Sequence, residues 1–346
     1  MLEFVMNSKP GRFFFIILLF FILSLLSACG GGSSSSGSDD ASDDDSHNAV
    51  DDDVNGDDDD NDDDNNDDNS DDDDLFDDDS GGSDDDTYMP PDGFEVIYFD
   101  VGQGDSFLLR FPAGSTMLID GGPNDQGYDT IIPYFHNLHL KHLNYMVSTH
   151  PHADHCGGLD EVIYNVEVDE VWENGETNDT GSWSDFVKAV ANSHIPVTIM
   201  KRGDTQDIDG CNVLVLSSNQ GYTGDEELNA NSMVLSVSCE NQKFLFTADI
   251  TEEPQNDLIS IYGNDLKSDV VKVPHHGSPD RAQDFPQYVL PSYAVISVGQ
   301  PNDYGHPSAQ VIQEWEDVGA TVYRTDNNGT VKISAKNGEL TTSTEH

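Results

Sequence analysis

The feature that most limits what this chain can fold into is an acidic stretch near its N-terminus. Residues 30–86 contain 27 Asp and no Glu, Lys or Arg, set among Ser, Gly and Asn with few apolar residues. This composition buries too little apolar surface to offset the entropy lost on ordering, and its like charges repel one another. We therefore expect a disordered, extended linker over residues 29–86 and a folded domain over residues 87–346.

One segment of the acidic stretch matches the start of a calcium loop. Asp51-Asp52-Asp53-Val54-Asn55-Gly56 has the spacing of alternating ligands, and Asp62 stands at the twelfth position in place of the usual Glu. Chance matches are expected in so biased a segment. Diffuse binding of divalent cations, or simple solvated spacing, therefore remains as the alternative interpretation.

The first 28 residues have the layout of a secretory signal. Lys9 and Arg12 precede an apolar run at 13–26, which is shorter than the roughly 20 residues that a spanning helix needs. Leu26-Ser27-Ala28-Cys29 resembles the lipobox of bacterial lipoproteins, which implies cleavage before Cys29 and lipidation of that residue. An ordinary signal peptide followed by an incidental cysteine is the alternative. Gly30 resembles the residue found in lipoproteins sorted to the outer membrane, so we expect an anchored, extracytoplasmic protein, periplasmic or surface-exposed.

The net charge restricts how this chain can bind a polyanion. The whole chain has 67 Asp and Glu against 14 Lys and Arg, a net charge of −53, and residues 87–346 alone carry −27. This excludes a nucleic-acid module that binds through its overall field, because phosphates are held by clustered Lys and Arg. Any polyanionic substrate must therefore be held through metal ions.

The hydrophobic patterns of residues 87–346 predict strands in groups with helices between them. Such an order predicts two sheets flanked by helices. The first three strands are separated by Gly-containing turns and are expected to form a meander. Strands are predicted at 94–101, 106–111, 116–120, 143–149, 168–172, 196–200, 213–217, 232–239, 244–248, 269–273, 294–298, 321–324 and 331–334. Helices are predicted at 128–140, 184–192, 251–262 and 308–317.

A dense group of metal-binding residue types follows the strand at 143–149. Thr149-His150-Pro151-His152-Ala153-Asp154-His155 places three imidazoles and one carboxylate within six residues. A loop that leaves a sheet can direct all four inward at one or two cations, and these ligands suit Zn, Mn or Fe. A single His is ordinarily a surface or core residue, but this density predicts a metal site.

These residues resemble the signature of the metallo-β-lactamase superfamily, and its other motifs follow in order. They are Asp120-Gly121-Gly122, Thr247-Ala248-Asp249 and Val273-Pro274-His275-His276-Gly277-Ser278. The runs Asp100-Val101-Gly102-Gln103-Gly104-Asp105-Ser106 and Tyr304-Gly305-His306-Pro307 are similar to the extracytoplasmic hydrolase domain of ComEC-type DNA-uptake proteins. The resemblance covers nearly the whole folded part, without the ComEC channel.

The resemblance implies a fold and a set of metal ligands. The fold is an α/β metallo-β-lactamase αββα sandwich, with two mixed sheets flanked by helices. The ligands surround one or two divalent ions: His150 and His152 on one, Asp154, His155 and His275 on the other, and Asp249 bridging both. Zinc is the metal we expect, with manganese or iron as alternatives. Two cations about 4 Å apart lower the pKa of a shared water toward neutrality and so generate a hydroxide nucleophile.

One departure from the superfamily pattern concerns the first cation. The superfamily commonly supplies a further His before Asp249, whereas here only His194 lies in that interval, at the end of a predicted helix where a surface role is expected. Asn229-Ala230-Asn231-Ser232 stands at the corresponding place and resembles the Asn/Ser form of the ComEC subgroup. We expect Asn231 and Ser232 at the cleft, and a first metal position that is weak, water-rich or empty.

Further residues are expected around the cleft. Asp100, Gln103 and Asp105 lie on a Gly-rich turn beside it. Asp120 is expected to orient a ligand imidazole through its second ring nitrogen, or else to cap the Gly-Gly turn.

Three residues are expected to act in catalysis, namely Asp154, His276 and His306. His306 lies in a Gly-His-Pro loop and is expected to face the site, where it would stabilise the transition state or protonate the leaving group. A structural role is its alternative. His276 is expected either to face the substrate or to support a ligand.

Three cysteines follow Cys29. If the strands that contain Cys211 and Cys239 pair antiparallel with positions that sum to 450, the two cysteines face each other, which predicts a disulfide in an oxidising compartment. Cys156 directly follows His155 and is expected to be a small buried residue, with a role as a soft metal ligand as the alternative.

These features predict a membrane-anchored, metal-dependent hydrolase that uses metal-bound hydroxide on phosphodiester bonds, in DNA or in a smaller phosphoester. The acidic surface opposes approach of DNA unless a local basic rim or high salt offsets it. The alternatives are an acyl hydrolase that acts on a lactam or lactone, and a non-catalytic surface module that binds metal. The sequence does not determine the oligomeric state.

Overall fold

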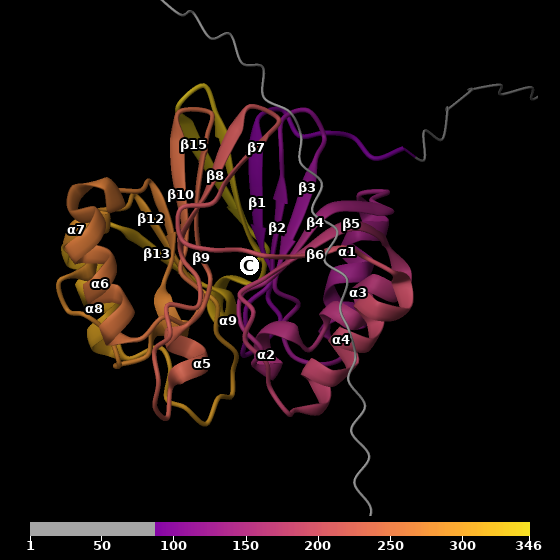
Figure 1. The fold of residues 1–346 in the computed structure, drawn as a ribbon. Helices are drawn as coiled ribbons and strands as arrows, with labels where there is room; N and C mark the ends of the chain where they lie inside the picture. Colours follow the sequence, from indigo (N-terminus) through magenta and orange to yellow (C-terminus); the bar gives the residue numbers. More distant parts are fainter. Residues whose placement is uncertain (1–86) are drawn as a thin grey trace, which may run out of the picture. The chain divides into compact units, whose positions relative to one another are not determined.

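The computed structural model describes residues 87–346. The predicted secretory leader, Cys29, the predicted linker and the candidate calcium loop all lie outside the described residues. Within residues 87–346, two β-sheets pack face to face and helices cover the outer face of each sheet (Figure 1). This is the predicted αββα sandwich, so the fold-class prediction is confirmed.

The first sheet contains eight strands in the order β15-β14-β1-β2-β3-β4-β5-β6. Its first three strands along the chain, β1, β2 and β3, pair antiparallel and form the predicted meander. Strands β3 to β6 pair parallel. Its strands are β1 (Phe94–Tyr98), β2 (Phe107–Arg110), β3 (Thr116–Ile119), β4 (His142–Ser148), β5 (Glu167–Glu173), β6 (Val197–Ile199), β14 (Val331–Lys336) and β15 (Glu339–Thr344).

The second sheet contains seven strands in the order β13-β12-β11-β10-β9-β8-β7. Strands β7 to β10 are antiparallel, and β10 to β13 are parallel. Its strands are β7 (Thr205–Ile208), β8 (Cys211–Ser217), β9 (Val234–Cys239), β10 (Gln242–Phe246), β11 (Val270–Lys272), β12 (Tyr293–Ile296) and β13 (Thr321–Arg324).

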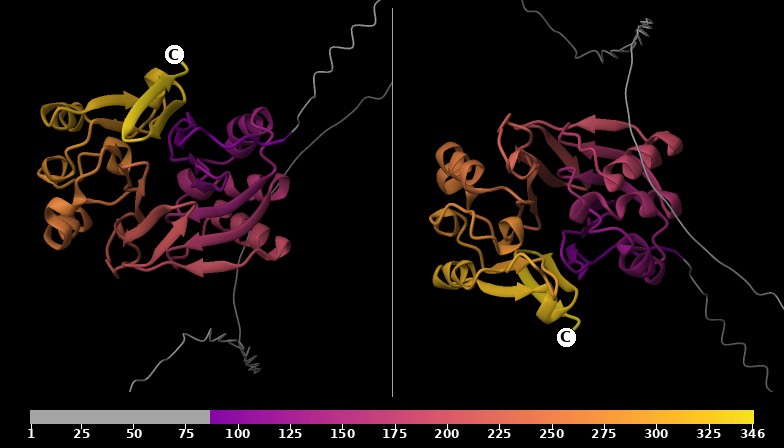
Figure 2. Two further views of the ribbon diagram at one scale, coloured as in Figure 1. Left: turned by 90° about the horizontal axis from the view of Figure 1, so that it is seen from above. Right: turned by 90° about the horizontal axis from the view of Figure 1, so that it is seen from below.

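Helices occupy the connections and cover both sheets, as Figures 1 and 2 show. The outer face of the first sheet packs against η1 (Gly127–Ile131), α1 (Ile132–Asn137), α3 (Leu159–Asn165) and α4 (Gly181–Ser193). The second sheet packs against α6 (Glu252–Tyr262), η2 (Gly263–Leu266), α7 (Phe285–Val289) and α8 (Ala309–Asp317). The remaining helices are short, with four residues each: α2 (Ala153–Cys156), α5 (Glu227–Ala230), η3 (Pro274–Gly277) and α9 (Thr325–Asn328). Among residues 87–346, no helix has the length and apolar character needed to cross a bilayer.

Strand β1 shows why the sequence folds into layers. All five of its residues are buried. Phe94, Val96 and Tyr98 face the core between the two sheets, whereas Ile97 belongs to the core between the first sheet and its helices. Successive side chains of a strand point to opposite faces, so adjacent apolar residues such as Val96 and Ile97 indicate a strand that is covered on both sides.

The structure contains elements that the hydrophobic pattern does not predict. Strands β7 and β15 are edge strands whose residues are largely exposed, so they lack the apolar alternation that marks a half-buried strand. Helices α3 and α7 have seven and five residues. Helices this short do not repeat an apolar stripe often enough to produce a helical period.

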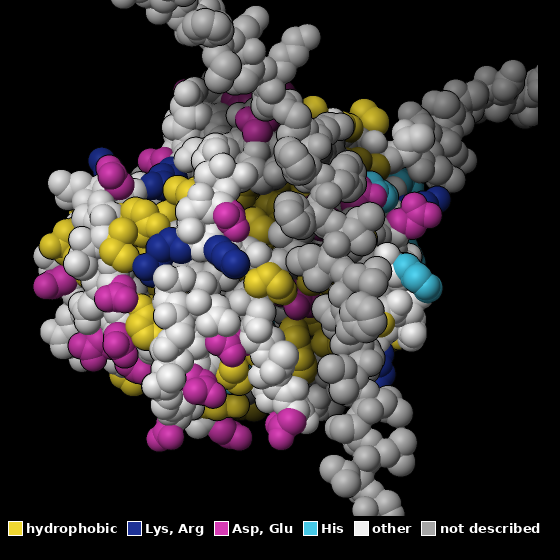
Figure 3. All heavy atoms as spheres, viewed as in Figure 1, with side chains coloured by type: hydrophobic (Ala, Val, Ile, Leu, Met, Phe, Trp, Pro, Cys, Tyr) yellow, Lys and Arg dark blue, Asp and Glu magenta, His cyan; other side chains and the backbone are white. Residues whose placement is uncertain are grey.

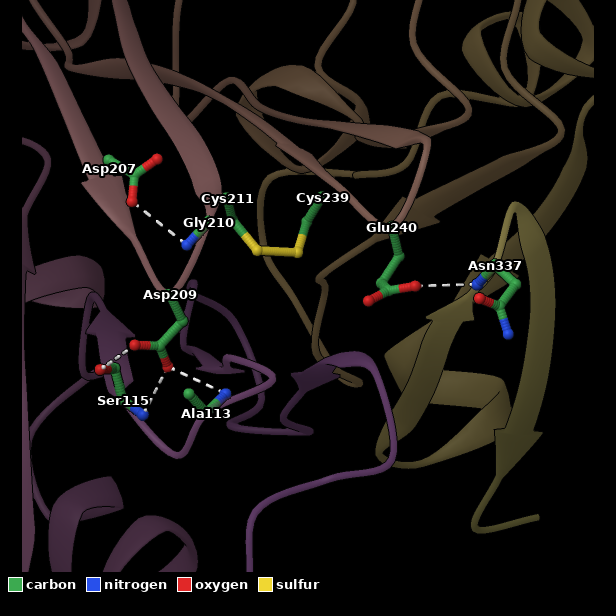
Figure 4. The surroundings of a disulfide bond; sticks show 9 residues. All are labelled: Ala113, Ser115, Asp207, Asp209, Gly210, Cys211, Cys239, Glu240 and Asn337. Atoms are coloured by element: carbon green, nitrogen blue, oxygen red, sulfur yellow. Dashed lines mark hydrogen bonds between the residues drawn. A yellow bond between two sulfur atoms is a disulfide. The ribbon is translucent and has the colours of Figure 1, made fainter.

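Cys211 and Cys239 are joined by a disulfide at the turn-rich end of β8 and β9, with their Cα atoms 4.6 Å apart (Figure 4). The register pairs Asn212 with Ser238, which is the predicted alignment. Beside the disulfide, Asp209 from the β7–β8 turn accepts hydrogen bonds from the backbone N–H groups of Ala113 and Ser115, at 3.1 and 3.0 Å. The disulfide therefore lies where hairpins of the two sheets are hydrogen-bonded together.

Candidate functional site

The histidine-rich loop begins where β4 ends and passes directly into α2. His150 and His155 are fully buried, whereas His152 and Asp154 are half-buried and reach the surface of a cavity. His150 Nε2 lies 3.0 Å from His152 Nδ1. Asn178 donates a hydrogen bond to the carbonyl of Pro151 at 3.0 Å and so holds the middle of the loop. This short segment therefore brings together two pairs of candidate ligands, His150 with His152 and Asp154 with His155.

Four side chains from three segments converge next to this loop. Asp154, His155, Asp249 and His276 each contribute one ligand atom, and these atoms all lie within 4.8 Å of one another. Oδ2 of Asp249 is 3.1 Å from Nε2 of His155 and 3.1 Å from Nε2 of His276, while Asp154 Oδ2 is 3.3 Å from His276 Nε2. We call this group the four-ligand cluster.

The second ring nitrogen of each cluster histidine is held by the protein. His155 Nδ1 lies 2.9 Å from Asp120 Oδ2, and His276 Nδ1 lies 2.8 Å from the carbonyl of Ser297. Asp120 also accepts hydrogen bonds from the N–H and the hydroxyl of Thr149, at 2.9 and 2.7 Å. In a neutral imidazole, a carboxylate or carbonyl that accepts a hydrogen bond from Nδ1–H leaves Nε2 without a proton and able to bind a cation.

The four-ligand cluster has the properties of a site for a divalent metal. Nε2 of His155 and of His276 are buried, and neither makes a hydrogen bond of ordinary geometry to any residue in the range 87–346. Two imidazoles and two carboxylates suit Zn, Mn or Fe. These orphaned, oriented nitrogens beside two carboxylates therefore fit a bound cation, whose identity the ligand types alone do not decide.

His275 and His276 are neighbours in the chain but lie in different surroundings. Both have left-handed backbones, with φ of 48° and 52°, in a turn that also includes Gly277 at φ 80°. His276 joins the four-ligand cluster, whereas His275 Nε2 is 4.0 Å from Asp249 Oδ2 and 3.4 Å from Nδ2 of Asn229. Consecutive left-handed non-glycine residues are strained, and such strain is concentrated at functional sites.

Lys272 is a component of the site that the sequence analysis did not identify. Its side chain is fully buried at the end of β11, and Nζ lies 2.5 Å from Asp105 Oδ2 and 3.1 Å from Asp249 Oδ1. A lysine within the apolar run Val270-Val271-Lys272-Val273, directly before the His275-His276 motif, was the available signal. A buried lysine is rare unless it is paired.

The charges of the cluster control its protonation. Burial alone would lower the pKa of His276 and His155, but the carboxylates around them, Asp249 first, raise the pKa of His276 to about 10 and that of His155 well above its usual value. Burial would raise the pKa of Asp249, but His276, His155 and Lys272 bring it well below its usual range. Burial, together with the neighbouring His155, lowers the pKa of His150 well below its ordinary value. In the metal-free protein the raised pKa values therefore favour the positively charged form of both cluster histidines at pH 7.

The cluster opens onto a cavity of about 520 Å³. The cavity is lined by neutral polar groups, acidic groups and imidazoles, with no Lys or Arg: Gln103, His152, Ala153, Asp154, Asn178, Thr180, Glu226, Asn229, Asp249, His275, His276, Ser278, Asp280, Tyr304 and His306. The ring of His306 lies 5.6 Å from that of His275 and stacks on Tyr304. Because Tyr304 is 72% exposed, it stands at the mouth.

The remaining predicted residues fall into two groups. Asp105 and Asp120 are fully buried beneath the cluster, and Gln103 lines the cavity. Asp100 does not line it, and its carboxylate instead accepts a hydrogen bond from the N–H of Gly102 at 3.2 Å. The Gly-Gly turn after Asp120 packs closely, since a Cβ on Gly121 would lie 2.7 Å from the backbone nitrogen of Leu159.

Asn231 and Ser232, which we expected at the cleft, do not border the cavity. The amide of Asn231 holds the adjacent loop instead, since its Oδ1 accepts hydrogen bonds from the N–H groups of Gly221 and Tyr222 at 3.0 Å each. Asn229 is the member of that run that reaches the cavity. Asn229 lies in α5 and Asn231 is the C-cap of that helix, and residues two positions apart on a helix do not face the same side.

His194 and Cys156 lie apart from the four-ligand cluster. His194 is exposed at the C-terminal end of α4, with Nδ1 2.9 Å from the carbonyl of Asn192. Cys156 is a free, buried thiol in the core between the first sheet and its helices. Burial raises its pKa to about 12, so the thiol remains protonated near neutrality.

We predict that metal binding releases protons. The raised pKa values of His155 and His276 mean that both are protonated at pH 7 without metal, and a cation requires both to be neutral. If two protons are released per cation, the affinity for the cation should increase roughly 100-fold for each unit by which the pH is raised near neutrality. Calorimetric titration with Zn²⁺ in buffers of different ionisation enthalpy measures the number of protons released per bound cation. Release of no protons would contradict the prediction.

Comparison with known proteins identifies the family. The family model described as the metallo-beta-lactamase superfamily matches residues 99–290. The ComE operon protein 3 of Bacillus subtilis is 28% identical over 261 residues, which are 70% of this chain and 33% of that protein. The competence protein ComA of Neisseria gonorrhoeae is 27% identical over 258 residues, 72% of this chain and 33% of that protein. This chain thus matches about a third of the length of either relative.

Among solved structures, the metallo-beta-lactamase fold protein YhfI from Bacillus subtilis aligns with 72% of this chain and with its own full length. The TM-score is 0.46 at 11% sequence identity. The match of the family model to more than half of the chain shows that this protein belongs to the metallo-β-lactamase superfamily, with ComEC-type competence proteins among its relatives.

Proposed function

We propose that residues 87–346 are a metal-dependent phosphodiesterase. The observation that carries the proposal is the four-ligand cluster, which is buried on one side and open on the other to a cavity large enough for a substrate. The relatives named for competence match this chain over the same domain, which favours DNA or a smaller phosphodiester as substrate. Those relatives are much longer than the matched region, so their whole activity does not transfer with it.

The protein groups divide into those that hold the cation and those that face the substrate. Asp154, His155, Asp249 and His276 would hold one ion, and His150 with His152 would face a second, weaker position. A bound divalent cation supplies two effects: it brings the pKa of a water molecule close to neutrality, and it stabilises negative charge on phosphate oxygens. Asp120 and the carbonyl of Ser297 keep the imidazoles in the tautomer that permits binding.

The charge of the cavity determines how a phosphodiester can be held there. Its lining has no Lys or Arg, and Asp and Glu side chains are scattered over the face shown in Figure 3. Repulsion from such a surface slows approach of a polyanion, and salt screens it. Affinity for the phosphate would therefore come from the cation and from neutral donors such as Asn178 and Thr180.

A direct assay tests the proposed function. The purified, metal-loaded protein is incubated with bis(p-nitrophenyl) phosphate, single-stranded DNA and a chromogenic lactam. We expect turnover of the two phosphodiesters, and we expect it to disappear on chelation and in His276→Ala, which removes a cluster ligand. Hydrolysis of the lactam alone would instead establish an acyl hydrolase. No turnover with Zn²⁺, Mn²⁺ or Fe²⁺ would favour a non-catalytic metal-binding module.

His306 is proposed to contact the reacting group from the mouth of the cavity. Burial, with His275 and His276 nearby, lowers the pKa of His306 to about 4, so its ring is neutral at pH 7 and can donate one hydrogen bond to a departing oxygen. We expect His306→Ala to lower kcat by about 10²-fold to 10⁴-fold. Metal stoichiometry should stay unchanged. Loss of bound metal in this variant would show a ligand role instead.

We also propose that Cys29 carries a lipid that anchors the domain outside the cytoplasm. The support is the lipobox-like run before Cys29, which lies outside the described residues. In a bacterial host given a labelled fatty acid, the wild-type chain should incorporate the label, whereas Cys29→Ser should carry none. Equal labelling of both forms, or of neither, would contradict the anchor.

A further inference from the structure

Lys272 has an ammonium group that is completely enclosed by acceptors from both sheets. Its side chain has no exposed surface. Nζ lies 2.5 Å from Asp105 Oδ2, 2.8 Å from the carbonyl of Ala248 and 3.1 Å from Asp249 Oδ1. An ammonium has three N–H donors. The carbonyl of Ala248 and Oδ1 of Asp249 accept two of them, and Asp105 forms an ion pair with the same ammonium.

This arrangement assigns different partners to the two oxygens of Asp249. Oδ1 accepts the hydrogen bond from Lys272, and Oδ2 faces the Nε2 atoms of His155 and His276 at 3.1 Å each. A carboxylate with neither oxygen held can rotate and bind a cation through one oxygen or through both. With Oδ1 engaged in a charged hydrogen bond, Asp249 presents only Oδ2 to the cluster.

The pairing is expected to persist when a cation binds. Asp105 is fully buried on the loop between β1 and β2, and its backbone N–H donates to the carbonyl of Asp154 at 3.1 Å. If Lys272 moved away, Asp105 would remain as a buried carboxylate without its cation, and breaking a buried pair in this way is strongly destabilising. Lys272 is therefore held in place by a second carboxylate that does not belong to the four-ligand cluster.

We propose that Lys272 is a positioning residue that restricts Asp249 to binding the metal ion through Oδ2 alone. The inference rests on the metal site proposed above. It limits Asp249 to a single oxygen shared between any two cations. It also disfavours Ca²⁺, which takes six to eight oxygen ligands and often binds carboxylates through both oxygens, relative to Zn²⁺, which is satisfied by four ligands.

The test compares a charge-neutral double variant with matched controls in the full-length protein. Lys272→Met with Asp105→Asn removes one positive and one negative charge together, so the net charge beside the cluster is unchanged and Asp105 does not remain as a carboxylate without its cation. Asp249 loses only the hydrogen bond at Oδ1, which is the interaction under test. Asp105→Asn alone keeps Lys272 on Asp249. Lys243→Met is a control for the lysine substitution itself. Lys243 lies away from the cluster, and its Nζ donates a hydrogen bond to the backbone carbonyl of Asp265 near the surface.

We expect the double variant to bind Zn²⁺ about 10-fold to 100-fold more weakly than wild type, the usual effect of losing a group that supports a ligand. Its Co²⁺-substituted form should lose intensity in the visible d–d bands, as a higher coordination number would produce, and Ca²⁺ should compete better for the site. The Lys243→Met variant should keep the wild-type Co²⁺ spectrum, and Asp105→Asn, which retains Lys272, should change it less than the double variant does.

Two results would overturn the inference. One is a folded double variant with wild-type Zn²⁺ affinity and a wild-type Co²⁺ spectrum, because Lys272 would then only fill space. The other is a crystal structure of the metal-loaded wild-type protein in which both oxygens of Asp249 bind the ion or Lys272 has left Oδ1; this structure decides the matter even if the double variant does not fold. A wild-type protein that binds no cation would refute the metal site itself, and the inference with it.

Discussion

The contact on which the rest of the site depends is the enclosure of the Lys272 ammonium between carboxylates from the two sheets. Asp105 comes from the loop after β1 in the first sheet, and Asp249 follows β10 in the second. A buried charge is tolerated only when it is paired, so this contact links the ends of both sheets at the place where the ligands converge. The position of Asp249, and so of the cluster, follows from it.

Around that contact, three of the four cluster ligands are held by groups that do not themselves line the cavity. Asp120 holds His155, the carbonyl of Ser297 holds His276, and Lys272 holds Asp249. Because these supports lie at strand ends in packed sheets, the ligands are placed by rigid elements rather than by a mobile loop. The positions of the ligands are therefore set by the packed sheets, and not by side chains at the surface.

The distribution of charge separates the cluster from the rest of the surface. Residues 87–346 carry a net charge of −27, and the cavity lining has no Lys or Arg, yet one fully buried lysine stands directly behind the ligands. Positive charge therefore lies at the four-ligand cluster, in Lys272 and in any cation that the cluster holds. An anionic ligand would meet attraction only at short range, which favours selection by local contacts over long-range steering.

Local residue patterns were sufficient to predict the fold class, the histidine-rich loop and the register that brings Cys211 opposite Cys239. They could not show that His276, and not His275, joins the four-ligand cluster, since a left-handed turn sends the two neighbouring rings into different surroundings. Only the tertiary structure decided this, and it also decided that Lys272 meets Asp105. Which way a side chain points, and which distant residue it meets, depends on the packing of whole sheets and leaves no periodic trace in the sequence.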